Sequence, residues 1–341
     1  MAIRVVITKA GNVSTIRTMP MEIPEVKDDE VRIKVAFAGI NFADLLMRLG
    51  FYQPRPPYPF TPGYEVSGVI DAVGKNVDGL REGQRVVAAM RHGGQSSFVV
   101  SKANRVISLP DTISLETAAA IPVTYLTAHH MLHHLGHLQP NDSVLIHGGA
   151  GGVGTAALQL CRWAGVSKIW STSSASKHPI LKQYGARPID RHHEDFEHII
   201  KAETEGKGVD HILDPIGGEN LRKSLAVLAQ GGRLYTYGLS SAAPSGRRSL
   251  LKAMFALRKT PKLDPLKLMV RNRAVFGVHM GTWTDEEVML GQLTHIIEGI
   301  QSGHLQPVID KIFPAQHVQE AHKYIHEAKN IGKVLLSFAE Q

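Results

Sequence analysis

Three glycines are spaced so that they could hold a diphosphate group. Gly149, Gly151 and Gly154 fit the pattern G-x-G-x-x-G, which follows the apolar run S-V-L-I-H and precedes apolar residues at helical spacing. The missing side chains permit a tight turn, close approach of the backbone to a pyrophosphate and close packing of the helix. Backbone amides at the helix start, including those of Gly152 and Val153, would add hydrogen-bond donors and positive potential. The pattern predicts a dinucleotide-binding turn.

The segment about 20 residues beyond these glycines distinguishes the two nicotinamide cofactors. An acidic side chain there would bind the ribose diol of NADH. This chain instead has Ser173, Ser174 and Lys177, and Arg191 follows the next predicted strand. Hydroxyl groups and cations suit a 2′-phosphate, so we expect NADPH. The alternative is that Lys177 is a solvated residue at a helix start.

Two regions of the chain, which must position the predicted cofactor-binding residues, differ in their pattern of apolar residues. Residues 1–122 are rich in β-branched residues, Gly and Pro, which predicts a β-rich partial barrel. From residue 143, six short apolar strands alternate mostly with helix-length stretches, which predicts a doubly wound parallel sheet. An amphipathic helix is expected from Glu286 to Gln301, and the strands after it should rejoin the first region. The expected fold class is α/β.

Composition sets the broad class of protein. The chain has 341 residues, of which 43% are apolar and 20% charged; this suits about two globular domains and excludes a disordered chain. Cys161 is the single cysteine, so neither an intrachain disulfide nor a four-cysteine zinc lobe can form. No apolar run reaches about 18 residues, and the first residues predict a strand rather than an export signal. We therefore expect a cytoplasmic protein.

Several separated motifs are similar to those of the medium-chain dehydrogenase/reductase superfamily. They are A-G-I-N-F-A-D-L-L-M-R-L-G-F-Y (38–52), P-G-Y-E-V-S-G-V-I (62–70), A-A-A-I-P-V-T-Y-L-T-A (118–128), H-G-G-A-G-G-V-G (147–154), D-P-I-G-G (214–218) and N-I-G-K-V-L-L (330–336). They resemble the zinc-free quinone oxidoreductase (zeta-crystallin-like) group, and R-N-R-A-V-F-G-V-H-M-G (271–281) resembles its vesicle amine transport protein branch. The resemblance implies a GroES-like catalytic domain of residues 1–122 and 283–341. A Rossmann domain of residues 123–282 would be inserted into it, with the active site between them.

The resemblance also bears on metal and substrate. Zinc-dependent relatives hold their catalytic metal with a cysteine and a histidine, and those positions here are Asn41 and Tyr64. Neither side chain supplies the thiolate or imidazole that zinc prefers, so we expect no metal site. A metal-free cleft could still pass hydride from NADPH to a quinone or an α,β-unsaturated carbonyl compound. An enoyl-thioester reductase is an alternative within the same chemistry.

Candidate residues for that cleft follow from the same comparison. Asn41, Tyr52 and Tyr64 could offer hydrogen bonds to the acceptor oxygen, with a tyrosine pKa near about 10. Alternatively, Asn41 bonds only local backbone and the tyrosines are apolar walls. The resemblance places four further residues beside the cofactor: Thr127, which could also be a helix cap, Gly238, Gly332 and Lys333.

Histidines and basic residues each gather in one segment. His129, His133 and His137, like His130 and His134, are spaced four residues apart. We expect them on a partly exposed helix that gains charge below about pH 6.5, rather than at a functional metal site.

The formal charge of +7 is concentrated in residues 247–273, which hold nine basic residues and one acid, Asp264. Between Pro244 and Pro261 the pattern is helical, with an apolar and a basic side. This segment could bind an anionic membrane surface, or it could cover the cleft or a subunit boundary with its apolar side buried. The chain could thus be a lipid-surface or partner-binding protein that keeps the dinucleotide fold. No nucleic-acid module accompanies the charge, and the resemblance implies a homodimer.

Overall fold

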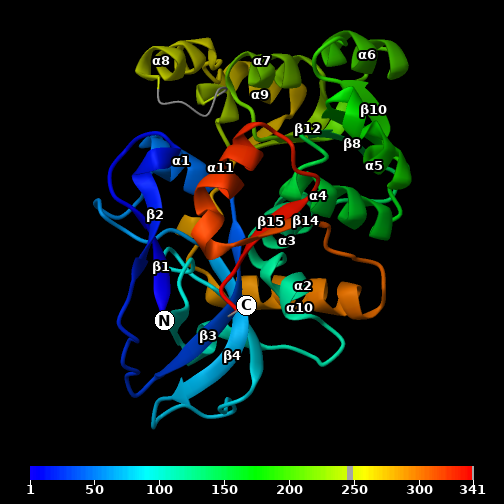
Figure 1. Cartoon of the computed structure of the whole chain (residues 1–341). Helices are drawn as coiled ribbons and strands as arrows, with labels where there is room; N and C mark the ends of the chain where they lie inside the picture. Colours follow the sequence, from blue (N-terminus) through cyan, green and yellow to red (C-terminus); the bar gives the residue numbers. More distant parts are fainter. Residues whose placement is uncertain (244–248, 340–341) are drawn as a thin grey trace.

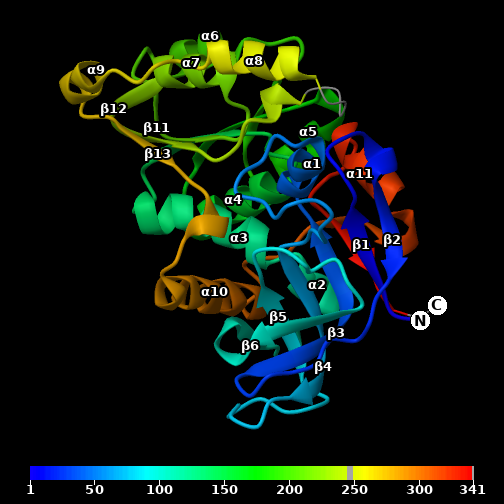
Figure 2. The same ribbon diagram turned by 90° about the vertical axis from the view of Figure 1, so that its left-hand side faces the viewer.

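Two large sheets organise the protein, with helices between and around them (Figures 1 and 2). The computed structural model describes residues 1–243 and 249–339, without the side chains of residues 250, 252 and 253. In the part described, one sheet has six strands and the other seven. Two further strands, β1 (Ile3–Ile7) and β2 (Ile16–Pro20), form a separate antiparallel pair.

The six-stranded sheet is parallel throughout. Its order is β10-β9-β8-β11-β12-β13, so the direction of winding reverses between β8 and β11. The strands are β8 (Ser143–His147), β9 (Lys168–Ser173), β10 (Arg187–Asp190), β11 (Val209–Asp214), β12 (Leu228–Thr236) and β13 (Ala274–Gly277). The connecting helices include α4 (Gly152–Trp163), α5 (His178–Gln183), α6 (Phe196–Glu203) and α7 (Gly218–Ala226). All six predicted strands form, and the doubly wound prediction is confirmed.

The seven-stranded sheet combines the two ends of the chain. Its order is β14-β15-β3-β4-β5-β7, and β6 also pairs with β3. The strands are β3 (Glu30–Ile40), β4 (Glu65–Val73), β5 (Arg85–Ala89), β6 (Phe98–Lys102), β7 (Val106–Ser108), β14 (Ile309–Pro314) and β15 (Lys333–Ser337). β15 is antiparallel to β3, with Val334 opposite Ile40. The last strands therefore rejoin the amino-terminal region, as the sequence predicts.

Helices fill the space between the sheets and cover their outer faces. α1 (Phe42–Leu49) and α11 (Val318–His326) lie side by side near the amino-terminal strands (Figure 1). α2 (Leu115–Ala119) is followed by α3 (Pro122–His129), which continues as a π-helical turn (His130–Leu135) and packs against α10 (Glu286–Gln301). α10 has the predicted bounds.

Two helices of the basic segment lie on the outer side of the six-stranded sheet: α8 (Leu250–Lys259) packs against α7, and α9 (Pro265–Arg271) lies near β12 (Figure 2). Helical periodicity predicted α8. Among the described residues, no helix has both the length and the apolar character that crossing a membrane requires.

Candidate active site and cofactor cradle

The glycine turn between β8 and α4 has no room for side chains at two of its three glycines. A Cβ on Gly154 would lie 2.5 Å from the Cα of Gly149 and even closer to the carbonyl oxygen of Gly148. A Cβ on Gly149 would overlap the hydroxyl of Ser171. A Cβ on Gly151 would meet one atom, the carbonyl oxygen of Gly148 at 3.3 Å, and Gly151 lines the free space of a cavity beside the turn. Gly149 and Gly154 thus permit the tight turn, while Gly151 leaves the backbone open to a ligand.

The start of α4 presents positive potential to that free space. The first four N–H groups of a helix, which here include those of Gly152 and Val153, have no partner inside it. The first turn of α4 carries no acidic residue. The helix dipole is therefore not neutralised locally, and the turn suits a diphosphate group.

A loop from the seven-stranded sheet lies against the glycine turn, where Gly332 forms a parallel bridge with Gly151. The amide of Gly332 donates to the carbonyl oxygen of Ala150 over 2.8 Å. Gly332 has a φ of +80°, and a Cβ there would collide with the carbonyl oxygen of Val308. The side chain of Asn330 donates to the carbonyl oxygen of Gly332 over 2.9 Å. This loop joins the two sheets at the cradle.

A small cavity of about 130 Å³ adjoins the turn, where the sequence predicts a 2′-phosphate. Ser173, Ser174, Lys177 and Arg191 all line it, and no described lining residue is acidic. The ammonium group of Lys177 donates to the carbonyl oxygens of residues 328 and 330, over 2.6 and 2.5 Å. Burial and the charge of Arg191 lower the pKa of Lys177, while Asp310 opposes them. Two cations and two hydroxyls thus meet at one cavity, an arrangement that suits a phosphate.

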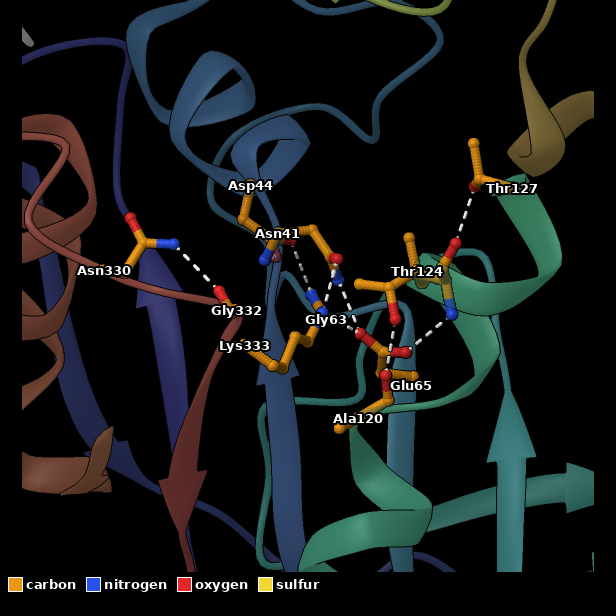
Figure 3. A network of polar contacts seen from close by, with 11 residues as sticks. Asn41, Asp44, Gly63, Glu65, Ala120, Thr124, Thr127, Asn330, Gly332 and Lys333 are labelled. Carbon is orange, nitrogen blue, oxygen red and sulfur yellow. Dashed lines mark hydrogen bonds and ion pairs between the residues drawn. The ribbon is translucent and has the colours of Figure 1, made fainter. Parts of the chain in front are cut away.

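On the other side of that loop, a buried polar network joins four elements (Figure 3). Asn41, at the junction of β3 and α1, donates from Nδ2 to Oε1 of Glu65 over 2.9 Å. Lys333, the first residue of β15, donates from Nζ to Oδ1 of Asn41 over 2.6 Å and forms an ion pair with Glu65. The amide of Val123, in α3, donates to Oε2 of Glu65 over 2.7 Å. The side chains of Glu65 and Lys333 are 0% and 3% exposed.

This network was largely missed by sequence reasoning. Glu65 was not predicted, although an acid inside the motif P-G-Y-E at the start of an apolar strand was a usable signal. The resemblance placed Lys333 beside the cofactor. Its ammonium group bonds to Asn41 and Glu65, and its Cδ lies 3.9 Å from where a Cβ on Gly152 would be, so a place beside the cofactor stays a prediction. Lys333 therefore lies between the cradle and the network.

Tyr52 and Tyr64 lie together beside Asp44. The hydroxyl of Tyr64 points to the sulfur of Met47, 3.8 Å away. Burial raises the pKa of Tyr52, which the neighbouring hydroxyl of Tyr64 partly offsets, and burial raises the pKa of Tyr64 strongly. The expected tyrosine pKa near about 10 is therefore wrong for these two phenols. They can donate hydrogen bonds, but they hold their protons more tightly than exposed phenols do.

Two further titratable residues beside these tyrosines, Asp44 and His279, were not predicted from the sequence. Asp44 is fully buried and accepts hydrogen bonds from the amides of Asn41 and Gly63. Burial raises the pKa of Asp44 to about 7, although both amides and Lys333 lower it. The ring of His279 lies 5.2 Å from that of Tyr52.

Two more residues, Thr127 and Gly238, were predicted to lie beside the cofactor. Thr127 lies inside α3 and its hydroxyl donates to the carbonyl oxygen of Val123 over 2.6 Å, so it is not a helix cap. Gly238 follows β12, and a Cβ there would lie 2.6 Å from the carbonyl oxygen of Pro215. That Thr127 and Gly238 contact a bound cofactor stays a prediction.

The histidine segment differs from its prediction. The expected ring pairs do form, with His129 and His133 centred 4.7 Å apart and His130 and His134 4.8 Å apart. However, α10 covers this segment, and the side chain of His129 contacts His295 over 2.9 Å. Burial lowers the pKa of His129 to about 3 and those of His130 and His133 to about 4. The prediction of charging below about pH 6.5 is therefore wrong for these three.

The basic segment, residues 247–273, also differs in part from its prediction. Arg247 and Arg248 lie outside the described residues. The guanidinium of Arg273 is partly buried, and it donates to the carbonyl oxygens of Leu225 in α7 and Ala229 in β12, over 3.1 Å each. The apolar side of α8 is exposed, so within this chain it does not bury itself over the cleft as one alternative required.

Comparison with known proteins identifies the family. The family model described as "Alcohol dehydrogenase GroES-like domain" matches residues 27–111, and the one described as "Zinc-binding dehydrogenase" matches residues 184–336. The "Synaptic vesicle membrane protein VAT-1 homolog" of Rattus norvegicus is 39% identical over 324 residues, which cover 94% of this chain and 80% of that protein. The "Quinone oxidoreductase" of Pongo abelii is 32% identical over 318 residues, which cover 92% and 91%.

A solved structure extends this likeness to the whole fold. The crystal structure of Escherichia coli quinone oxidoreductase complexed with NADPH has a TM-score of 0.85 and 25% identity, covering 98% of this chain and 99% of that chain. The chain belongs to the medium-chain dehydrogenase/reductase superfamily. Within this superfamily of oxidoreductases it is close to the VAT-1 homologues and the quinone oxidoreductases.

The zinc in the name of the second family model does not fit the residues at this site. Asn41 and Tyr64 hold amide and phenol groups where zinc ligands would be thiolate and imidazole. The amide of Asn41 is already bonded to Glu65 and to the ammonium group of Lys333. In the part of the chain described, no group of three or more His, Cys, Asp or Glu side chains could hold a metal ion.

Proposed function

We propose that the chain is an NADPH-dependent reductase that works without zinc and passes hydride to a quinone or an α,β-unsaturated carbonyl compound. The observation that carries the proposal is the network of Asn41, Glu65 and Lys333, which puts an ammonium group next to the residue that replaces a zinc ligand. NADPH, when bound, supplies the hydride, and electron-poor quinones and enones accept hydride without a Lewis acid.

The proposed cofactor-binding residues surround the glycine turn and the adjoining cavity. They are Thr127, Gly149, Gly151, Gly152, Val153, Gly154, Ser173, Ser174, Lys177, Arg191, Gly238, Gly332 and Lys333. The amides of α4 would hold the diphosphate, and Lys177 and Arg191 would hold the 2′-phosphate. The NADPH of the Escherichia coli enzyme supports this choice of cofactor.

Three residues of the chain are proposed to act on the acceptor. Tyr52 and Tyr64 would donate hydrogen bonds to the oxygen that gains negative charge, because their raised pKa keeps both protonated. Asn41 would help to orient the acceptor, since Glu65 and Lys333 fix its amide in one position. None of these roles requires a metal ion.

The proposal also covers the domain bounds, the subunit contact and the cellular location. We retain residues 1–122 and 283–341 as the catalytic domain and residues 123–282 as the nucleotide-binding domain. β13 is the edge strand of the six-stranded sheet and would be the place where two subunits meet in a homodimer. The single cysteine suits a cytoplasmic location.

A substrate panel tests this function. Purified protein should oxidise NADPH in the presence of p-quinones or 2-alkenals, followed by the loss of cofactor fluorescence. Exclusive turnover of long enoyl-CoA esters would replace the proposal with an enoyl-thioester reductase. Failure with every member of the three classes would reject a reductase.

A second function, binding to an anionic membrane, is favoured by the exposed face of α8 and α9. Of the twelve large apolar side chains that are exposed in the described chain, eight lie between residues 251 and 270. They include Leu251, 75% exposed, and Val270, 78% exposed. Five exposed cations accompany them: Arg258, Lys259, Lys262, Lys267 and Arg271. Clustered cations near acidic lipid contribute about 1 kcal/mol each, and the apolar side chains would enter the interface.

Sedimentation with liposomes tests this second function. The protein should sediment with phosphatidylserine vesicles and stay in solution with phosphatidylcholine vesicles. Substituting Leu251→Asp and Phe255→Asp together should abolish sedimentation, whereas Ile312→Asp, at an exposed apolar residue of β14, should not. Equal sedimentation of all three proteins would reject a role for this face.

A further inference from the structure

A second cavity lies close to Tyr64. It has a volume of about 350 Å³ and is bounded by the end of β5, by α3 and by the first turns of α10. Its lining is mostly apolar and includes Met90, Leu126, Met280, Met289 and Leu293. Ligand sites of small molecules are of this size and are lined mainly by apolar side chains. Methionines adapt to the shape of a flexible ligand.

This cavity adjoins the residues of the proposed acceptor site. Gly281 lines it, and a Cβ on Gly281 would lie 3.7 Å from Cε1 of Tyr64. Met90 also lines it, and its amide donates to the carbonyl oxygen of Tyr64 over 2.8 Å. Met280 directly follows His279, whose ring lies against Tyr52. A molecule whose head meets the two tyrosines could therefore extend past Gly281 into the cavity.

The polar groups of the cavity limit what can enter. The guanidinium of Arg105 is paired with Glu286, with Nε 2.9 Å from Oε1, and Asn104 donates to the same carboxylate over 3.1 Å. Arg105 and Glu286 thus form an ion pair whose side chains are half-exposed, and Arg91, which also lines the cavity, is exposed. Nε1 of Trp283 is buried with no partner among the described residues, so the apolar wall offers a donor to a neutral acceptor atom.

We infer that this cavity holds the apolar tail of the electron acceptor, whose carbonyl head lies beside Tyr52 and Tyr64. This rests on the proposed function and names its substrate class: carbonyl compounds with a flexible alkyl or prenyl tail. Most of the lining is apolar, and the charged lining residues, Arg91, Arg105 and Glu286, are exposed or half-exposed, so the interior suits an apolar tail rather than an ionic group.

The chain-length dependence of turnover tests the inference. With 2-alkenals from four to twelve carbons, kcat/KM should rise about fourfold per added methylene until the cavity is full, because each buried methylene contributes about 0.8 kcal/mol. Met289→Trp, from α10, and Ala89→Phe, from β5, should each occupy part of the cavity. Both should lower the ratio of kcat/KM for ten-carbon and four-carbon alkenals. Glu287→Trp, on the exposed side of α10, should leave the ratio unchanged.

A binding measurement separates this inference from the proposed function. The variant Trp163→Phe/Trp170→Phe retains Trp283 as its only tryptophan. Decan-2-one, added to this protein with NADP⁺, should change its fluorescence saturably, and Met289→Trp in wild type should weaken decan-2-one binding measured by calorimetry. Turnover that is independent of chain length, with no fluorescence change, would overturn the inference and leave the proposed function standing. Saturable binding with no turnover of any acceptor would reject the proposed function, and with it the assignment of the cavity to an acceptor tail.

Discussion

Replacing Glu65 with glutamine tests the buried network most sharply. The carboxylate receives three donors on two oxygens, from Asn41, Lys333 and Val123. Glutamine keeps the shape but has one oxygen and an NH₂ group. The NH₂ group of the glutamine must therefore face a group that is itself a donor. The ammonium group of Lys333 also loses its counter-charge, although the Lys333 side chain is only 3% exposed.

The expected loss of stability follows from this burial. Removing one partner of a buried ion pair costs about 3–5 kcal/mol, because the other charge stays desolvated. The unfolding entropy of globular proteins is about 2.1 cal/mol/K per residue near 60 °C, which is about 0.7 kcal/mol/K for this chain unfolding as one unit. Glu65→Gln should thus lower Tm by about 4–7 °C. Solvent screening does not reduce the loss, since Glu65 is 0% exposed.

Thermal unfolding followed by circular dichroism measures this loss. Glu82→Gln, at an exposed acid, is the matched control and should change Tm by less than about 1 °C. The double variant Glu65→Gln/Lys333→Met should lose less than the two single losses added together, because it removes both charges. A Tm of Glu65→Gln equal to that of the control, or losses that add fully, would refute a coupled buried pair.

Three further predictions concern the cradle and the buried histidines. Lys177→Ala should weaken NADPH binding about 10- to 150-fold, the loss of one charged hydrogen bond, and leave NADH binding nearly unchanged in a fluorescence titration; equal losses would remove the 2′-phosphate assignment. Gly154→Ala should abolish binding of both cofactors, because its Cβ overlaps the turn; normal affinity would show that the turn holds no diphosphate. Burial lowers the pKa of His129 to about 3 and the pKa values of His130 and His133 to about 4. Between about pH 6.5 and 4, these three histidines therefore bind protons in the unfolded chain but not in the folded chain. Stability should therefore fall as pH drops through this window, although Asp44, whose pKa is raised to about 7, opposes the three histidines; a Tm that is equal at pH 7.5 and 5 would contradict this.

Local patterns predicted the framework because each depends on neighbouring residues. The six parallel strands and the bounds of α10 follow from apolar periodicity. The glycine turn follows from glycine spacing between an apolar run and a helical pattern. The pairing of Glu65 with Lys333 could not be predicted in this way, since the two residues are 268 positions apart. Only the return of β15 to β3 brings them together.

Burial was the property least accessible from sequence. The histidine spacing correctly predicted the ring pairs, but nothing within that segment indicated that α10, more than 150 residues later, would cover it. The side chain of His295 comes from that helix. Similarly, the apolar side of α8 was identified, but whether other parts of the chain cover it depends on the packing of the whole fold.

The central claim is that hydride passes from NADPH to an electron-poor acceptor without help from a metal ion. Protein dialysed against a chelator should be given NADPH deuterated at C4 of the nicotinamide together with a 2-alkenal, and the product analysed by mass spectrometry. One deuterium per product molecule, formed at the same rate with and without the chelator, is the predicted result. A product without deuterium, or activity that disappears with the chelator and returns with zinc, would contradict the claim.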